Sequence, residues 1–135
     1  RLMIALEMIG YYDSAPGSQD YPYPAMSWLY PDRGDFIAVV GRIQDINAVR
    51  QVKAALLSSQ DLSVYSMNTP GFIPGIDFSD HLNYWQHDIP AIMITDTAFY
   101  RNKQYHLPGD IADRLNYQKM AQVVDGVTTL LYNSK

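Results

Sequence analysis

Two histidines, each with an aspartate close by, mark the part of the sequence with the clearest capacity for chemistry. His81 follows Asp80 directly, and His106 precedes Asp110 by four residues. Between them lies the apolar run 89–95, IPAIMIT, which is short for a helix and typical of a buried strand. Because functional side chains are often carried on loops beyond the ends of a rigid core strand, this layout predicts a site around the run.

A structural role for the same residues stays open on chemistry alone. Ser79 and Asp80 are residue types that cap the amino end of a helix, here a short one over HLNYW. Asp110 and Asp113 have the spacing of a capped start to the last helix of the chain. Under this interpretation the histidine–aspartate neighbours are hydrogen-bonded pairs that bind no ligand.

The absence of cysteine limits the kinds of site that the chain can form. A metal site must use histidine and carboxylate, and a catalytic zinc needs about three such ligands and a water. The candidate ligands are Glu7, Asp80, His81, Asp96, His106 and Asp110. A Ser-His-Asp site with Ser18 or Ser79 as nucleophile is a weaker interpretation, because no GxSxG motif occurs. The sequence also contains no HExxH, GxGxxG or phosphate-loop motif.

Composition indicates one globular domain. The 135 residues are 47% hydrophobic and 18% charged, with a formal net charge of −4 and no basic run. We therefore expect no nucleic-acid partner. We also expect no membrane span, because every apolar run falls short of the ~20 residues that a span requires. Eleven tyrosines, many beside proline in the loop 11–35, are compatible with an aromatic-lined pocket and equally with loops packed on a sheet.

The elements that position these residues alternate along the chain. Strands are predicted over Leu2–Leu6, Phe36–Gly41, Leu62–Met67 and 89–95, and helices from Asp45 or Asn47 to about Ser59 and from Ile111 to about Asn133. The first strand is expected to be central, with Glu7 at its carboxyl end, where open α/β sheets bind ligands. The third strand alternates and is expected near an edge. This order predicts a three-layer α/β/α fold with a mostly parallel or mixed sheet.

Four segments together resemble the carboxyl-terminal half of a zinc aminopeptidase of the co-catalytic di-zinc exopeptidase family, which includes the glutaminyl cyclases. They are LEMIGYY at 6–12, SDHLNYW at 79–85, IPAIMITDTAF at 89–99, and RNKQYHLPGD at 101–110 followed by LNY. Their order matches that of the family and they cover nearly the whole chain. The resemblance implies a zinc-exopeptidase-like fold.

The resemblance assigns metal and catalytic roles to three residues. Glu7 would be a ligand to one zinc and His106 a ligand to the other. Asp80 would lie beside the site as a catalytic residue that orients or tunes its carboxylate network. Two positions depart from the family pattern, because Leu107 and Ile111 stand where threonine is frequent. This leaves Asp110 better explained as a helix cap than as a catalytic group.

The resemblance also implies how the substrate would be held. Tyr105 and the loop 97–102 would line the substrate pocket, with Tyr100 and Arg101 as further contacts. His81 would be structural, holding its own loop by hydrogen bonds.

The upstream half of the family's site does not occur in these 135 residues. There is no His-x-Asp motif, no bridging aspartate and no Glu-Glu pair, whose first member is the general base in relatives. We therefore expect residues 1–135 to be the carboxyl-terminal part of a single zinc-peptidase domain, inactive alone, whose full-length form binds two zincs and cleaves amino-terminal peptide bonds. A sheet that lacks its first strands should also self-associate. A secreted or periplasmic location is implied by the resemblance alone.

Three alternatives remain open. A glutaminyl-cyclase-like acyltransferase would work with a single zinc, so metal stoichiometry separates it from the aminopeptidase. A metal-free homologue would keep the fold and act as an interaction domain. An unrelated α/β domain that binds a small molecule is the third alternative.

Overall fold

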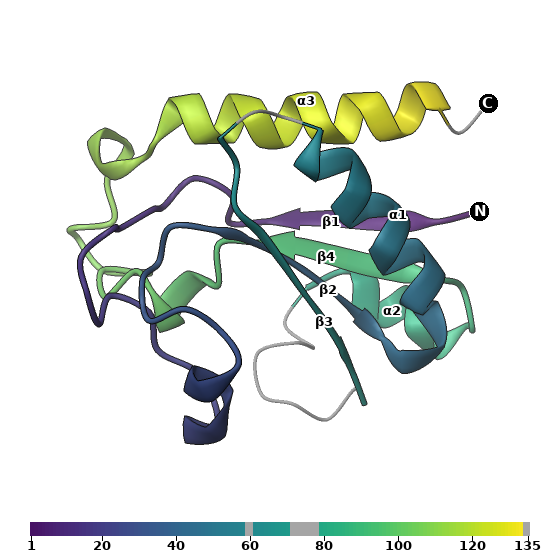
Figure 1. The fold of residues 1–135 in the computed structure, drawn as a ribbon, viewed down its shortest axis with the longest axis horizontal. Helices are drawn as coiled ribbons and strands as arrows, with labels where there is room; N and C mark the ends of the chain where they lie inside the picture. Colours follow the sequence, from purple (N-terminus) through teal and green to yellow (C-terminus); the bar gives the residue numbers. More distant parts are fainter. Residues whose placement is uncertain (59–60, 71–78, 134–135) are drawn as a thin grey trace.

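One mixed four-stranded sheet organises the residues that the computed structural model describes, namely 1–58, 61–70 and 79–133 (Figure 1). The strands are β1 (Met3–Glu7), β2 (Ile37–Arg42), β3 (Val64–Thr69) and β4 (Ala91–Thr95), in the spatial order β1-β4-β2-β3. β1 is parallel to β4 and β2 to β3, whereas β2 is antiparallel to β4. The four predicted strands and the mixed sheet are confirmed.

The strand register brings two carboxyl ends and two amino ends to the same end of the sheet. Glu7 of β1 pairs with Thr95 of β4, and Thr95 in turn pairs with Ala38 of β2. Ile37 pairs with Val64 of β3. We call this the site end of the sheet. The loops that leave β1 and β4 begin here, beside the loops that lead into β2 and β3.

Helices cover both faces of the sheet and produce the predicted three layers (Figure 1). α1 (Ile46–Leu57) and α3 (Tyr117–Asn133) pack on one face, where Val52 and Val123 contact core residues such as Ile92. α2 (His81–Gln86) covers the opposite face with the buried Trp85. None of the helices in the described ranges is long and apolar enough to cross a membrane.

The long segment between β1 and β2 is an ordered loop, as predicted. It is closed at its base by an isolated bridge between Asp13 and Gly34, and it contains the short 3₁₀ helix η1 (Pro24–Trp28). The Gln19 amide donates to the Asp32 carbonyl at 3.1 Å, which holds the two limbs of the loop together. In Figure 1 the loop extends beyond the site end of the sheet.

Three expectations about individual elements are wrong. The last helix begins at Tyr117 and not at Ile111, and Asn116 caps it by accepting a hydrogen bond from the Lys119 amide at 3.0 Å. Asp80 occupies the N-cap position of α2 but makes no side-chain cap bond. β1 is an edge strand of this sheet and not a central one. The proline- and glycine-rich composition of residues 68–78 predicts a loop there, and most of this segment lies outside the described residues.

Candidate functional site

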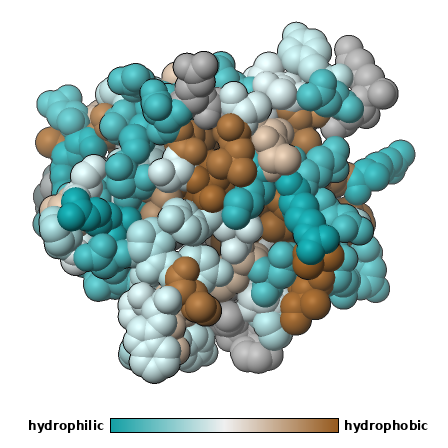
Figure 2. Space-filling view, viewed as in Figure 1, coloured by the Kyte–Doolittle hydropathy of each residue, from teal (hydrophilic) through white to brown (hydrophobic). Residues whose placement is uncertain are grey.

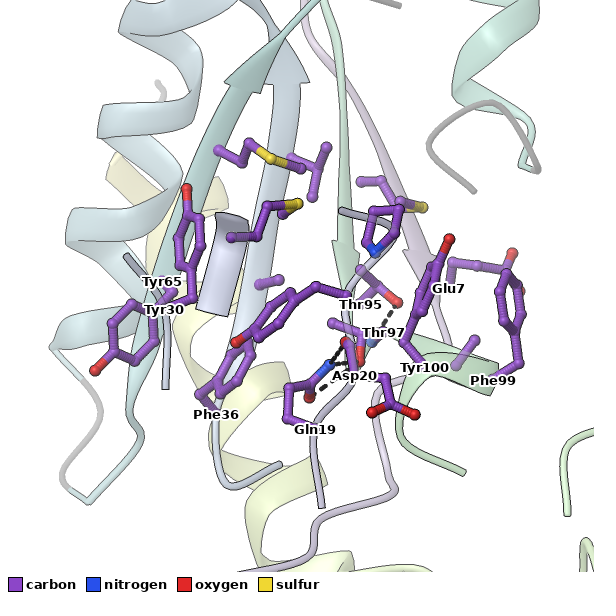
Figure 3. Close-up of a pocket in the computed structure, with 18 of the residues that line it drawn as sticks. Glu7, Gln19, Asp20, Tyr30, Phe36, Tyr65, Thr95, Thr97, Phe99 and Tyr100 are labelled. Atoms are coloured by element: carbon purple, nitrogen blue, oxygen red, sulfur yellow. Dashed lines mark hydrogen bonds between the residues drawn. The ribbon is translucent and has the colours of Figure 1, made fainter. Parts of the chain in front are cut away.

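A largely apolar cavity of about 110 Å³ lies at the site end of the sheet (Figure 3). Its floor consists of side chains from β2, β3 and β4, including Val40, Met67 and Met93. Aromatic residues of the surrounding loops and strands form its walls, namely Tyr21, Tyr30, Phe36, Tyr65, Phe99, Tyr100 and Tyr105. Apolar cavities of roughly this size hold a small ring or a single apolar side chain. The cavity is therefore suited to one apolar group of a ligand.

Two of the aromatic walls are built by contacts between rings that lie far apart in the sequence. Tyr30 lies 5.9 Å from Tyr21 and 6.2 Å from Tyr65, between ring centroids, and Phe36 meets the Tyr65 ring edge-on at 5.1 Å. The Tyr21 hydroxyl donates to the Pro31 carbonyl at 2.6 Å. Burial raises the pKa of both Tyr21 and Tyr30, so their phenols stay neutral at physiological pH. These walls are uncharged and rigidly packed.

Glu7 provides a carboxylate on the wall of this cavity. It is the last residue of β1 and is half-buried, and Ser79 donates its hydroxyl to Glu7 Oε2 at 3.0 Å. Figure 3 shows Glu7 near Thr95 and Tyr100. Asp80, the residue after Ser79, is exposed and does not line the cavity. Of Glu7 and Asp80, only Glu7 lines the cavity, and Ser79 fixes the orientation of the Glu7 carboxylate.

His106 lies on the loop that follows β4 and is exposed. Its imidazole stacks on the ring of Tyr105, with 3.9 Å between centroids and 16° between planes. Tyr105 lines the cavity and His106 does not, so the imidazole packs against a residue of the cavity wall without lining the cavity itself. Among the residues of the described ranges, no group of three or more histidines and carboxylates is close enough to hold a metal ion.

The three predicted substrate contacts occupy two different environments. Tyr100 and Tyr105 both line the cavity, together with Phe99, whose ring is 4.5 Å from Tyr100 and 5.8 Å from Tyr105. Arg101 is only 3% exposed and does not line the cavity. It donates to Gln19 Oε1 at 2.9 Å and stacks on the Phe36 ring at 4.6 Å. Arg101 therefore lies outside the cavity lining and packs against Phe36 of the cavity wall.

Two further hydrogen bonds from Arg101 show what it fixes. Its Nη1 donates to the carbonyl of Tyr11 at 3.0 Å and to that of Phe36 at 2.9 Å. The same side chain thus joins both ends of the β1–β2 loop to the loop after β4. Gly34 permits this arrangement, because a Cβ there would lie 2.5 Å from the Arg101 Cδ.

Asp96 joins the loops that leave β1 and β4. One carboxylate oxygen accepts from the amides of Gly10 at 3.1 Å and Tyr11 at 2.8 Å, and the other accepts from the Ala98 amide at 2.9 Å. Burial raises the pKa of Asp96 to about 6, against the opposing effect of these amides and of Arg101. Asp96 was a candidate ligand on sequence grounds, and the structure uses both of its oxygens for the backbone.

Unusual backbone conformations gather in these loops. Met8, Thr97, Ala98 and His106 have positive φ angles of 55°, 75°, 48° and 58°. Such conformations are costly for residues other than glycine, and they persist where surrounding contacts impose them. Their concentration in the loops after β1 and β4 indicates that these loops are built to a fixed shape, as at ligand-binding sites.

Sequence reasoning missed two hydrogen-bonded polar residues of the cavity lining, Gln19 and Thr97. Gln19 is 6% exposed, and its amide nitrogen donates to Thr97 Oγ1 at 2.9 Å (Figure 3). Asp20 lies beside it and forms an ion pair with Lys103. The only sequence signal was the length of the loop 11–35, because loops of this length in compact domains are usually functional.

The fold of the chain is similar to part of the fold of a solved aminopeptidase. The solved structure of the Legionella pneumophila LapA aminopeptidase matches 97% of this chain with a TM-score of 0.64 and 18% sequence identity, and the chain covers 31% of that protein. This similarity establishes a partial exopeptidase-like α/β fold. No protein-family model matches the sequence.

A second comparison concerns a protein of nearly identical sequence. The chain is 97% identical over all its 135 residues to the uncharacterized protein YfbL of Escherichia coli (strain K12). It spans 42% of the length of that protein. In both comparisons, therefore, the similar protein is more than twice as long as this chain.

Proposed function

We propose that the chain is the carboxyl-terminal part of a zinc-dependent peptidase domain of the aminopeptidase type. The observation that carries this proposal is the position of Glu7, a half-buried carboxylate oriented by Ser79 on the wall of an apolar, aromatic cavity. His106 lies on the next loop, stacked on a residue of the same wall. The aminopeptidase-like fold supports the proposal, since such sites lie beyond the carboxyl ends of strands.

The donor atoms available here fit zinc. Glu7 would hold one zinc and His106 the second, because carboxylate oxygen and imidazole nitrogen are both normal zinc ligands. Bound zinc would polarise the peptide carbonyl and supply an activated water. The remaining ligands and the general base would come from outside this chain. Ser79 would keep the Glu7 carboxylate in one orientation, in the way that hydrogen-bonded neighbours commonly fix metal ligands.

The cavity would bind the side chain of the amino-terminal residue of a peptide. Its apolar floor offers favourable burial, roughly 25 cal/mol for each Å² of apolar surface removed from water. Tyr100 and Tyr105 form the wall between this pocket and the His106 loop. Asp80 would act from outside the cavity through its neighbour Ser79, which contacts Glu7 directly.

The free side of β1 supports the proposal that the domain continues beyond this chain. Among the described residues, β1 pairs with β4 along one side only, and its sequence MIALE lacks the proline or lysine that protects exposed edges. Leu6 at 48% exposed, with Trp28 and Leu29 at 86% and 79%, adds uncovered apolar surface. Figure 2 shows apolar side chains reaching one face of the molecule in separate patches.

We therefore propose that further strands of the same domain cover β1, and that the chain of 135 residues alone self-associates through this edge. Light scattering of the isolated chain over a range of concentrations tests the second statement. A mass that stays that of one chain at the highest concentration contradicts self-association.

The function is tested on a protein of the full YfbL-like length that contains this chain. Zinc content is measured by elemental analysis, and hydrolysis is measured with aminoacyl nitroanilides that carry a free amino group. We expect two zincs per chain and aminopeptidase activity. Glu7→Ala and His106→Ala should each reduce the zinc content by one. The exposed residues Asp125 and His87 provide matched controls, since their alanine variants should retain both zincs.

Other outcomes identify the alternatives. One zinc per chain, with no peptidase activity and with cyclisation of amino-terminal glutamine, indicates a glutaminyl-cyclase-like acyltransferase. A folded protein without zinc and without either activity refutes the proposal and indicates a metal-free interaction domain.

A further inference from the structure

We propose that Asp110 and Asn102 are positioning residues for His106, so that its imidazole is already in place before any metal binds. The starting observation is the backbone of His106, which has a φ of 58° on an exposed loop. The carboxylate of Asp110 accepts a hydrogen bond from the His106 amide at 3.3 Å. This contact connects the backbone of His106 to a side chain four residues further along the same loop. The inference rests on the proposed role of His106 as a metal ligand.

Asp110 is itself held by a buried side chain. Asn102 is only 1% exposed, and its Nδ2 donates to Asp110 Oδ1 at 2.8 Å. The Asn102 Oδ1 accepts from the Gln104 amide at 3.0 Å and from Arg114 Nη1 at 2.9 Å. Both ends of the amide group are thus engaged, which fixes its orientation. The carboxylate of the exposed Asp110 is therefore held in place by a hydrogen bond from the buried Asn102.

Arg114 connects this group to the other side of the site. Its Nη2 donates to the Tyr11 hydroxyl at 2.8 Å, and its guanidinium lies 4.8 Å from the centre of the Tyr11 ring. Tyr11 belongs to the loop after β1, whose backbone Asp96 binds at the Tyr11 amide. The loop that carries His106 and the loop that follows Glu7 are therefore parts of one hydrogen-bonded frame.

If His106 binds a metal, this hydrogen-bonded frame would favour binding by ordering the histidine in advance. An exposed loop with a left-handed residue would sample other conformations, and a ligand histidine would then have to be ordered at the moment of binding. Side chains that fix a ligand in advance remove that cost, and their loss commonly lowers metal affinity about 10- to 100-fold. Asp110 acts through the backbone of His106 and not through its ring, so its role is positioning.

The first test uses the zinc-free protein of YfbL-like length and measures amide hydrogen exchange by NMR. Asp110→Ala should accelerate exchange at the His106 amide about 10-fold or more, while the strands β1 and β4 keep their protection. Asp113→Ala, at an exposed aspartate three residues further along the chain, is the matched control and should change nothing. Unchanged exchange at His106 in Asp110→Ala overturns the proposal.

The second test titrates the same variants with zinc alone. Asp110→Ala should bind the zinc that depends on His106 about 10- to 100-fold more weakly. Asp110→Asn, which retains an acceptor oxygen for the His106 amide, should lose less. The Co²⁺ absorption spectrum provides a signature that a global loss of stability would not shift. Asn102→Asp is the second variant, because its new carboxylate would repel that of Asp110 without leaving a cavity.

Failure of this proposal differs from failure of the proposed function. Faster exchange in Asp110→Ala with undiminished zinc affinity overturns positioning, while zinc loss in His106→Ala still supports the function. Undiminished zinc binding in His106→Ala removes the ligand role of His106 and overturns both.

Discussion

Protonation of the buried Asp96 gives this chain an unusual dependence of stability on pH. Burial raises the pKa of Asp96 in the folded chain to about 6, from an ordinary value of 3.8. Between these two pH values the folded state holds a proton that the unfolded state has released. The contribution of Asp96 to the free energy of unfolding is therefore fully present below pH 3.8, and it is lost as the pH rises towards 6. This sign is opposite to that of most aspartates, whose carboxylates are stabilised by folding.

The size of the effect follows from the shift. Each unit of difference in pKa corresponds to about 1.4 kcal/mol, so the ionisation of Asp96 should lower the free energy of unfolding by about 3 kcal/mol between pH 3 and pH 8. Asp96→Asn removes the titrating group and keeps the size of the side chain. The difference in stability between the two proteins should therefore change by about 3 kcal/mol over this range, in favour of the variant as the pH rises.

Urea denaturation of the two proteins, followed by circular dichroism at half-unit steps of pH, measures this difference. Asp125→Asn is the control, because Asp125 is exposed on α3 and its substitution should leave the pH profile unchanged. Other titrating groups are common to all three proteins and cancel in the comparison. Parallel profiles for the wild-type chain and Asp96→Asn would show that the carboxylate is not destabilised by burial.

Two further predictions concern buried contacts outside the cavity lining, one between helices α1 and α3 and one made by Arg101. Gly126→Ala in α3 should destabilise the chain by up to about 2 kcal/mol, because an added Cβ would lie 2.9 Å from the Leu56 Cα, and the overpacking cost of about 1–3 kcal/mol is larger than the helix-propensity gain of ~1 kcal/mol. Its urea midpoint should fall below that of Thr128→Ala on the exposed side of α3, and a higher midpoint would contradict the packing. Arg101→Lys should cost at least ~2 kcal/mol, because a lysine cannot reproduce the hydrogen bonds to Gln19, Tyr11 and Phe36 along the β1–β2 loop. The exposed Arg50→Lys is its control, and equal urea midpoints for the two lysine variants would contradict the structural role of Arg101.

The architecture followed from local patterns in the sequence. Runs such as FIAVVG and IPAIMIT predicted strands because a strand buried on both faces needs a continuous apolar stretch. The apolar stripe of the last helix was also visible, with Val123 and Leu130 in the core as their spacing requires. The position of Glu7 at the end of the first strand could also be predicted, because the apolar run LMIAL ends directly before it.

Boundaries were less predictable than elements. The chain from Ile111 to Asn116 has helix-forming residues, yet helix α3 starts only at Tyr117. Asp110, which a capping pattern would place at the helix start, is instead bonded to Asn102 and to the His106 amide. Aspartate serves both as a helix cap and as an anchor within a loop, and only the position of its hydrogen-bond partners distinguishes the two roles.

The sequence by itself determined the layers of this protein, the residue types at its strand ends and the absence of cysteine chemistry. The tertiary structure alone decided which of these residues meet. Strand order places Thr95 between Glu7 and Ala38, and the cavity is built from four strands and from the loops that follow β1 and β4. The same packing buries Arg101 against Phe36 of the cavity wall. Periodicity reports which face of an element is apolar, whereas a site depends on contacts between elements whose separation along the chain carries no such signal.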